Sequence, residues 1–375
     1  MDHRIFGLDL LRALAIVFVV LRHGLSYFQP HFNTRPLTFF LLDGVSVFFV
    51  LSGFLIGQIL IKRISTHGGG FSQLRQFWVR RWFRTLPNYF LVLLVVLSLS
   101  WYYRGYTPIE GLPFFVFLQN FAWPHPPVFP EAWSLSVEEW FYLVFPICSF
   151  FLFKTKDSLK HGFPWLIFSF ILFSVLLRHF RFETVSITSF REWDLLLRKQ
   201  VVTRFDSLML GILGSWFATF YAEKWQARSR LKMIIGILLL VVNQLAFYYA
   251  KPIFGGVSWY HAVPSFLIFA IGIFMLLPSL SGYTKSKSRL APAITKISLV
   301  SYSLYLLHYT FTKGFVIPLT MRGALAESTF ILDTVRFIIY LAFSTTASIL
   351  LYKFYERPTT QWRDRFSRKK QDTIN

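Results

Sequence analysis

The stretch Asp9–His23, DLLRALAIVFVVLRH, begins an apolar run that is long enough to cross a bilayer as a helix, for which about 20 residues are needed. The run nevertheless contains the charged or titratable residues Asp9, Arg12, Arg22 and His23. Charges at membrane depth are costly and rare, so each of them needs a reason. Arg12 and His23 are about three helical turns apart, so they share one helix face and lie about 16 Å apart along its axis. The stretch predicts a first membrane helix with one polar face turned into the protein.

Two interpretations of this helix are open from the stretch alone. In the first, Asp9 pairs with Arg12 three residues later, the cation lies near one membrane surface, and the His23 imidazole lies deeper toward the other. In the second, Arg12 and Arg22 extend to the membrane surfaces and His23 only caps the outer end of the helix. The stretch by itself favours neither.

The composition of the whole chain agrees with a membrane protein. Of its 375 residues 54% are hydrophobic, 20% are aromatic and only 15% are charged, against about 25% charged residues in a soluble domain. The net charge of +21 does not indicate a nucleic-acid partner, because the basic residues lie between long apolar runs rather than on one basic domain. The single cysteine, Cys148, can form no internal disulfide. The first run contains charges and no small-residue cleavage site follows it, so we do not expect a signal peptide.

The apolar runs predict an all-α polytopic membrane protein, a bundle of about ten transmembrane helices. A further stretch, 108–122, is too short to span and is expected to form a half-helix or re-entrant element packed against protein. We expect one membrane-embedded domain, 1–358, followed by a basic cytoplasmic tail, 359–375. The predicted spans are 7–28, 36–61, 85–103, 133–153, 163–178, 203–221, 232–250, 259–280, 296–316 and 329–354.

Lysine and arginine are distributed unequally between the two sides that these spans define. The segments on the side of the N-terminus carry 25 of these residues and the segments on the other side carry 11. Because basic loops stay in the cytoplasm, both termini are expected there, in a multi-pass protein of the cell (inner) membrane. Six of the outer residues belong to the stretch 178–204, which is expected to be a folded element rather than a short connection.

On the predicted inner side, Arg80, Arg81 and Arg84 come just before the third span. Arg81 and Arg84 are three residues apart, so they are neighbours on a helix that enters the membrane. Guanidinium groups suit polyanionic phosphates, which makes this cluster a candidate phosphate site. The alternative interpretation is the ordinary excess of positive charge on the inner side of membrane proteins.

Polar side chains also recur at the predicted outer ends of several spans, where they form a second candidate group. Glu138 belongs to a pair of adjacent carboxylates, which is more than a helix cap requires, and Tyr305 and His308 share a helix face. No His and Cys spacing typical of a metal site is present, so no metal is expected. A Gly-x-Ser-x-Gly elbow, a P-loop and the His-x4-Asp signature of glycerolipid acyltransferases are also missing from the sequence. The residues of this outer group are His23, Asp43, Trp133, Ser134, Glu138, Asp206, Tyr305 and His308.

Five short motifs follow one another along the chain. They are Gly7–Ala13 together with His23, Gly44–Phe54, Arg81-x-x-Arg84 followed by Leu-Pro, Trp133–Tyr142, and Ser301–His308. In this order, over roughly residues 4–358, the chain resembles acyltransferase family 3. That family comprises integral membrane O-acyltransferases that modify sugars, among them O-antigen and peptidoglycan acetylases. The resemblance implies that Arg12 with His23, and Arg81 with Arg84, are functional residues.

The resemblance implies transfer of an acyl group, most simply acetyl, from cytoplasmic acyl-CoA such as acetyl-CoA. The acceptor would be a hydroxyl of an envelope or secreted glycan or glycolipid, such as the O-antigen of lipopolysaccharide. The arginine cluster would hold the phosphates of the donor. His23 would act as general base or as a transient acyl carrier, with Glu138 or Asp43 orienting its imidazole. The residues expected to contact the acceptor are Trp133, Ser134, Asp206, Tyr305 and His308.

A transporter or flippase is the alternative function, in which Arg12, His23 and Glu138 form an ion or proton path. Against it, the chain lacks the paired Gly- or Pro-broken half-helices that inverted repeats produce. A non-catalytic sensor is a third possibility, and the intact Arg12, His23, Arg81 and Arg84 argue against it.

Overall fold

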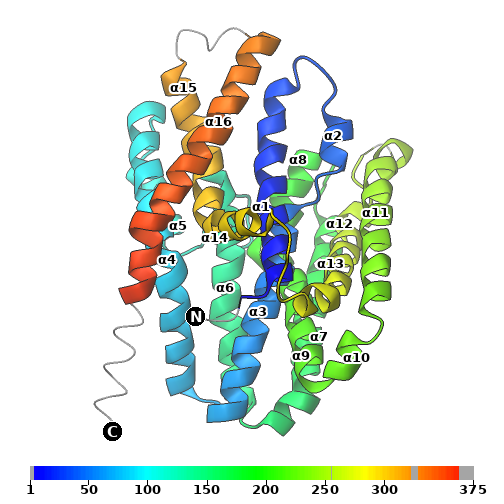
Figure 1. Ribbon diagram of the computed structural model, residues 1–375. Helices are drawn as coiled ribbons and strands as arrows, with labels where there is room; N and C mark the ends of the chain where they lie inside the picture. The colour runs from blue at the N-terminus through cyan, green and yellow to red at the C-terminus, as the bar shows by residue number, and fades with distance from the viewer. Residues whose placement is uncertain (1–3, 255, 322–327, 363–375) are drawn as a thin grey trace.

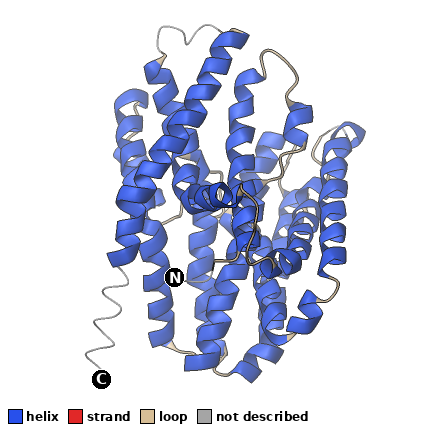
Figure 2. Cartoon of the chain, in the orientation of Figure 1, coloured by secondary structure: helices blue, strands red, loops and turns tan. Residues whose placement is uncertain are grey.

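The computed structural model describes residues 4–254, 256–321 and 328–362. These residues form helices joined by loops and short helical turns, and no strand occurs among them (Figure 2). Within the described residues, seven helical segments are long and apolar enough to cross a membrane. The chain is therefore an all-α polytopic membrane protein, as the sequence predicts. Most of the predicted tail, 359–375, lies outside the described residues.

Each of the ten predicted spans contains a helix. These helices are α1 (Phe6–Gly24), α3 (Gly44–His67), α4 (Phe71–Arg104), α6 (Trp133–Leu152), α7 (Lys156–Thr184), α9 (Phe205–Phe220), α11 (Ser229–Phe254), α13 (Pro264–Gly282), α14 (Ala291–Leu307) and α16 (Phe330–Leu351). Three of them are not among the seven long apolar segments. Helix α1 contains Asp9, Arg12 and Arg22, and α9 and α14 have only 16 and 17 residues.

Shorter elements connect these helices. The predicted half-helix at 108–122 is a helix of 8 residues followed by a loop. The stretch predicted to fold at 178–204 forms three short elements after the end of α7. The short elements are α2 (Arg35–Phe39), α5 (Pro108–Phe115), α8 (Phe190–Trp193), α10 (Ala222–Gln226), α12 (Trp259–Ala262), α15 (Ile317–Thr320), and the 3-10 or π turns η1 (Leu25–Phe28), η2 (Pro130–Ala132), η3 (Asp194–Arg198), η4 (Val201–Thr203), η5 (His308–Val316) and η7 (Tyr352–Glu356).

Two helices extend further than the sequence predicts. Helix α4 begins at Phe71 rather than near 85, directly after Gly68 and Gly70, whose φ angles of 72° and 125° favour glycine. The three predicted phosphate-binding arginines therefore lie within a regular helix. Helix α7 runs to Thr184, so Arg178, which was expected in an outer loop, lies inside a helix and is completely buried.

Glycines bring α3 into backbone contact with α9. A Cβ atom added to Gly53 would lie 1.9 Å from the carbonyl oxygen of Leu208, and one added to Gly211 would lie 2.0 Å from that of Val50. Such distances leave no room for a side chain, so the small-xxx-small spacing of Gly53 and Gly57 lets the two helices pack closely.

The start of α3 lies directly against the middle of α1. A Cβ atom on Gly44 would lie 2.2 Å from the carbonyl oxygen of Ala15, so the residues around Asp43 are held beside the helix that carries His23. In Figure 1, α1, α3 and α14 lie in the centre of the bundle, α4 and α16 on one side of it, and α11 and α13 on the other. Residues from the two ends of the chain therefore meet at the centre.

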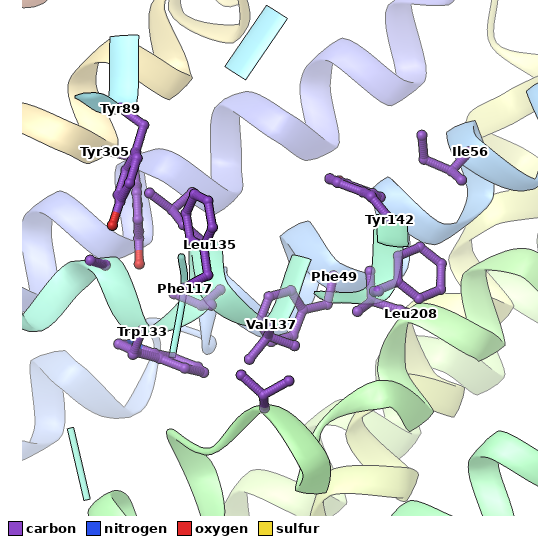
Figure 3. Packing of buried hydrophobic residues seen from close by; sticks show 14 of the residues in the cluster. Phe49, Ile56, Tyr89, Phe117, Trp133, Leu135, Val137, Tyr142, Leu208 and Tyr305 are labelled. Carbon is purple, nitrogen blue, oxygen red and sulfur yellow. The ribbon is translucent and has the colours of Figure 1, made fainter. Parts of the chain in front are cut away.

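Aromatic and aliphatic side chains fill the space around this centre (Figure 3). Phe49 on α3 packs edge-on against Trp133 at the start of α6, with ring centroids 5.8 Å apart and ring planes inclined by 85°. Tyr89 and Tyr142 are almost completely buried beside them. This tight packing fixes the helices whose polar side chains form the candidate site.

Candidate active site

Two neighbouring cavities lie inside the bundle, and the side chains of Val45 and Tyr305 line both of them. We name the first the arginine cavity and the second the histidine cavity. Their volumes are about 150 Å³ and about 190 Å³ respectively. The polar walls of the arginine cavity include Arg12, Arg81, Arg84, Ser134 and Glu138. Those of the histidine cavity include His23, Asp43, Glu131, Trp133, Arg198 and Lys199.

A third recess, which we name the basic mouth, continues the arginine cavity. It shares Arg12, Arg84 and Glu356 with that cavity and adds Arg4 and Arg357. The basic residues that are added come from the two ends of the membrane domain, on the side that the charge asymmetry predicts to be cytoplasmic. The three spaces thus form one series, from the basic mouth through the arginine cavity to the histidine cavity.

Arg12 points into the bundle. Its Nη1 donates to Asp9 at 3.4 Å and to Ser298 on α14 at 3.3 Å. Arg4 also pairs with Asp9, at 2.6 Å. The predicted pairing of Asp9 with Arg12 is confirmed. Both Arg12 and His23 line internal cavities, which agrees with a polar helix face turned into the protein.

Arg81 is held firmly in the wall of the arginine cavity. Its guanidinium lies 4.1 Å from the centre of the Tyr142 ring and donates a hydrogen bond to the Tyr142 hydroxyl. That hydroxyl donates to Glu138 at 2.8 Å, and the Arg81 Nη2 atom lies 3.6 Å from Glu138 Oε2. Helices α4 and α6 therefore present a cation whose charge is partly balanced by a carboxylate of the same cavity.

His23 lies at the other end of the series, near the C-terminal end of α1. Its Nδ1 atom is 2.8 Å from Nε2 of His308. The ring of Tyr309 packs against it, with centroids 4.5 Å apart. Lys313 donates to the carbonyl oxygen of His23 at 2.8 Å and also bonds the Ser26 hydroxyl. The imidazole is thus contacted by His308 and Tyr309, and the main chain of His23 is held by Lys313, all three from the single segment η5.

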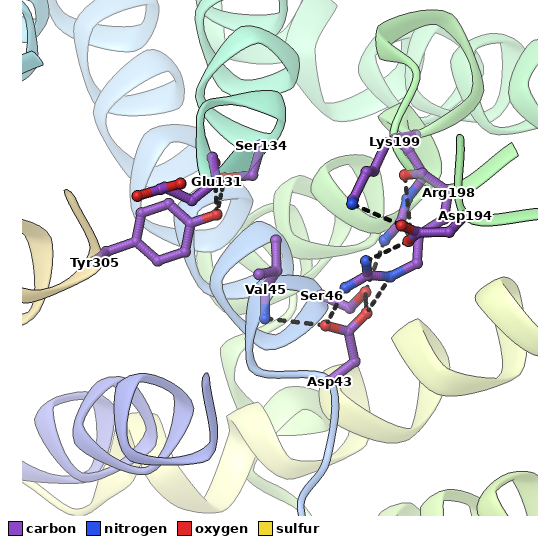
Figure 4. Close-up of polar contacts among 10 residues, drawn as sticks. Asp43, Val45, Ser46, Glu131, Ser134, Asp194, Arg198, Lys199 and Tyr305 are labelled. Carbon is purple, nitrogen blue, oxygen red and sulfur yellow. Dashed lines mark hydrogen bonds and ion pairs between the residues drawn. The ribbon is translucent and has the colours of Figure 1, made fainter. Parts of the chain in front are cut away.

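Asp43 joins the start of α3 to the folded segment after α7 (Figure 4). It caps α3 by accepting from the Val45 amide at 3.3 Å, and it pairs with Arg198 at 3.0 Å. Arg198 and Lys199 also pair with Asp194, at 2.9 Å and 2.6 Å. Burial would raise the pKa of the Asp194 carboxyl, but the charges of these two cations outweigh it and hold the pKa below its ordinary value. The cluster is therefore a set of fixed charges.

Tyr305 stands where the two cavities meet. Its hydroxyl lies 2.7 Å from the Ser134 hydroxyl and donates to the carbonyl oxygen of Glu131 at 2.9 Å (Figure 4). The Glu131 carboxylate accepts from the amide of Thr310 at 2.8 Å and from its hydroxyl at 2.5 Å. These bonds tie η2, α6, α14 and η5 together around the junction.

A family model described as an acyltransferase domain matches residues 5–353. The chain belongs to acyltransferase family 3. The resemblance drawn from the motifs is confirmed. No solved structure matches the chain.

The curated relatives of this family 3 member carry related names. A Staphylococcus aureus protein provisionally named an O-acetyltransferase is 26% identical over 94% of this chain and 56% of its own length. The O-acetyltransferase OatA of Staphylococcus aureus is 27% identical over the same shares of the two chains. The peptidoglycan O-acetyltransferase OatA of Listeria monocytogenes is 31% identical over 37% of this chain and 23% of its own length. The chain therefore spans about half the length of the Staphylococcus relatives that it matches.

The structure brings most of the predicted site residues of this family 3 protein together, but in two groups. Arg12, Arg81, Arg84, Ser134 and Glu138 surround the arginine cavity. His23, Asp43 and Trp133 line the histidine cavity, and Tyr305 lines both.

The predicted position of Glu138 beside His23 is wrong. Helix α6 begins at Trp133 beside the histidine cavity, and Glu138 lies more than one turn further along, so it faces the arginine cavity and bonds Ser52 at 3.1 Å. Asp43 lines the same cavity as His23, but its charge is directed to Arg198. The predicted carboxylate partner of the imidazole is therefore replaced by His308.

Three further predicted residues line neither cavity. Asp206 is completely buried in an ion pair with Arg178 at 2.6 Å, because Arg178 lies inside α7 and its charge needs an internal partner. Arg80 is exposed on α4. His308 is buried behind His23 rather than on a cavity wall.

Sequence reasoning missed several residues of the site. Glu131, Arg198 and Lys199 line the histidine cavity but lie in short elements whose position no helical period predicts. The six basic residues of the stretch 178–204 did predict a folded element there, but not which of its residues line the cavity. Glu356, which lines the arginine cavity and accepts from Asn88 at 2.9 Å and from Ser303 at 2.6 Å, was not predicted as a site residue.

Proposed function

We propose that this chain is a membrane O-acyltransferase that moves an acyl group, most simply acetyl, from cytoplasmic acyl-CoA to a hydroxyl of an envelope or secreted glycan. Membership of acyltransferase family 3 and the names of its relatives support the reaction type. The single observation that carries the proposal is the series of spaces that leads from clustered arginines to a histidine and passes through one junction at Val45 and Tyr305.

The basic mouth and the arginine cavity suit the donor. Coenzyme A carries phosphates at one end and a long, largely neutral arm with the thioester at the other. Arg4, Arg84 and Arg357 would hold the phosphates by charge-assisted hydrogen bonds. The arginine cavity beyond them has apolar walls as well as cations, including Phe48 and Leu135, and would take the arm. Cytoplasmic acyl-CoA would enter from this side.

The histidine cavity suits the acceptor and the chemical step. His23 would remove the proton from the acceptor hydroxyl while its oxygen attacks the thioester carbon. A carbon–oxygen bond forms, the carbon–sulfur bond breaks, and the proton passes from the imidazole to the departing coenzyme A sulfur. Trp133 and Tyr309 in the same cavity offer aromatic faces to a sugar ring. The glycan hydroxyl would arrive from the outer side.

The proposal fixes a topology. The donor is cytoplasmic, so both termini lie in the cytoplasm and the histidine cavity opens toward the other face of the cell (inner) membrane, in agreement with the charge asymmetry. Reporter fusions at residues 192 and 375 should then report opposite sides of the membrane. Reporters on the same side would contradict this topology.

The reaction itself can be tested on the purified full-length chain in lipid nanodiscs. Wild-type protein should bind acetyl-CoA and release coenzyme A when an envelope glycan fraction is added, and mass spectrometry of the glycan should find the acetyl ester. His23→Gln should lower transfer by roughly 10²–10⁴-fold, since an amide cannot take up the proton, while acetyl-CoA binding is kept. His161→Gln is the matched control, because His161 is 69% exposed on α7, away from both cavities. Transfer that survives in His23→Gln would rule out the base assigned here.

A further inference from the structure

The two histidines of the site meet in a specific geometry. Nδ1 of His23 and Nε2 of His308 are 2.8 Å apart, whereas the ring centroids are 5.0 Å apart and the ring planes are inclined by only 21°. The centroid distance exceeds the nitrogen distance by about one ring width, so the rings lie edge to edge and nearly in one plane. This is the arrangement in which the N–H of one imidazole is directed at the lone pair of the other.

The main chain decides which of these two nitrogens carries the hydrogen. The other ring nitrogen of His308, Nδ1, lies 2.8 Å from the carbonyl oxygen of Tyr305 and 3.1 Å from that of Leu304. Carbonyl oxygens only accept, so Nδ1 of His308 must be the donor. In the neutral ring Nε2 then has the lone pair, and the hydrogen between the two rings belongs to Nδ1 of His23. Nε2 of His23 is left with its own lone pair, free to accept a proton.

The segment that carries His308 is built to hold this position. The α-helical turns of α14 end at Leu307, and the wider π turns of η5 begin at His308. Such turns are rare and are frequent at functional sites. Through this change of pitch the consecutive residues His308 and Tyr309 both contact the His23 ring, and Lys313 binds the His23 carbonyl oxygen. His308 itself is completely buried, so it is sheltered from solvent and from the acceptor.

We propose that His308 is a positioning residue that holds His23 as its Nδ1–H tautomer, so that Nε2 of His23 is the atom that takes the proton from the acceptor hydroxyl. A neutral imidazole here does what a carboxylate does in many catalytic triads. The inference rests on the proposed function for its chemical meaning, whereas the tautomer follows from the contacts alone. The positioning role also replaces the acceptor-binding role that the sequence predicts for His308.

Matched substitutions of His308 test the positioning role. The side-chain oxygen of His308→Gln can accept the same hydrogen bond, so this variant should keep transfer within about tenfold of wild type. His308→Leu removes the acceptor at similar size and should lower kcat by about 10²–10⁴-fold, the range for general-base catalysis and for a catalytic histidine held as the wrong tautomer. In both variants KM for acetyl-CoA should stay within about twofold, because the donor cavity is untouched. Equal losses in the two variants, or a changed KM with an unchanged kcat, would overturn the proposal.

A spectroscopic measurement on the wild-type chain separates this inference from the proposed function and does not depend on whether a variant folds. The protein is labelled with ¹⁵N-histidine in lipid nanodiscs, and the His23 signals are assigned by their loss in His23→Gln. The nitrogen shifts should show a proton on Nδ1 and none on Nε2, whether or not the preparation transfers acetyl groups. A proton on Nε2 of His23 would refute the positioning role even if the enzyme is fully active. A confirmed tautomer in a protein that never transfers acetyl groups would instead refute the proposed function.

Discussion

The arginine and histidine cavities differ in how they are built. The cations of the arginine cavity project from α1 and α4, two long helices, and its apolar wall is made largely by α3. The histidine cavity takes Arg22 and His23 from α1, but the rest of its charged wall comes from short elements: the residue before α3, the turns η2 and η3, and Lys199. Rigid spans suit a donor that is the same in every reaction, whereas short connecting elements are where proteins vary their specificity. Under the proposed function, the acceptor rather than the donor would therefore be selected by the less regular part of the molecule.

Blocking the junction between the cavities should have the largest effect. Val45 is 7% exposed and lines both spaces together with Tyr305. Val45→Trp should fill the opening between the two cavities and lower transfer more than roughly 100-fold. Acetyl-CoA should still bind from the basic mouth, because the substitution separates the binding of the donor from the reaction. Transfer and acetyl-CoA binding are measured on the same nanodisc preparation.

Val45→Ala is the control, because it opens the junction rather than closing it and should keep transfer within about threefold. Overpacking costs about 1–3 kcal/mol in a well-packed core, so the melting temperature of Val45→Trp is measured as well. Normal transfer by a folded Val45→Trp variant would show that the acyl group does not pass this way, and the two cavities would then be separate sites.

Substitutions of Arg84 and Arg81 should lower activity by intermediate amounts, and the two should differ in their effects on KM and on the melting temperature. Arg84 lines both the basic mouth and the arginine cavity. A hydrogen bond to a charged group contributes about 1.5–3 kcal/mol. Arg84→Ala should therefore raise KM for acetyl-CoA about tenfold or more with little change in kcat. Arg81→Ala should raise KM too and should also lower the melting temperature, because it leaves Glu138 without its cation in a largely buried site.

The double variant Arg81→Ala with Glu138→Gln checks this distinction. Removing the negative charge should restore most of the melting temperature but not the KM, since the cation for the donor is still absent. A reduced kcat with an unchanged KM in Arg84→Ala would place that arginine in the chemical step instead of in donor binding.

The sequence predicts the helices and the shared face of Arg81 and Arg84 because both follow from helical periodicity. A spacing of three residues places Arg81 and Arg84 on one helix face wherever the helix begins. In the same way, the spacing of eleven residues places Arg12 and His23 on one face of α1. Depth is harder to predict: Glu138 and Trp133 belong to one motif but face different cavities, because each helical turn moves a side chain by about 5.4 Å along the span.

The histidine cavity could be predicted only in part. Trp133 was found because it begins a predicted span, and Asp43 because it is a charged residue near the outer end of another. Arg198 reaches Asp43 over more than 150 positions of sequence, and nothing local to either residue encodes that ion pair. The contact of His23 with His308 joins the two ends of the chain in the same way. Such contacts depend on how α1, α3 and α14 pack, which no single stretch specifies.

The smallest effect is expected at Arg80, the neighbour of the donor arginines. It is exposed and lines neither the basic mouth nor the arginine cavity, although the sequence groups it with Arg81 and Arg84. Arg80→Ala should therefore change KM for acetyl-CoA by less than about twofold, because an exposed charge outside a binding site contributes about 0–1 kcal/mol at most. The same kinetic series that measures Arg84→Ala also measures this variant, at low and at high salt, since screening would reveal any long-range attraction of the donor. A tenfold rise in KM would mean that the donor phosphates extend onto the exposed face of α4, and the basic mouth defined here would then be only part of the donor site.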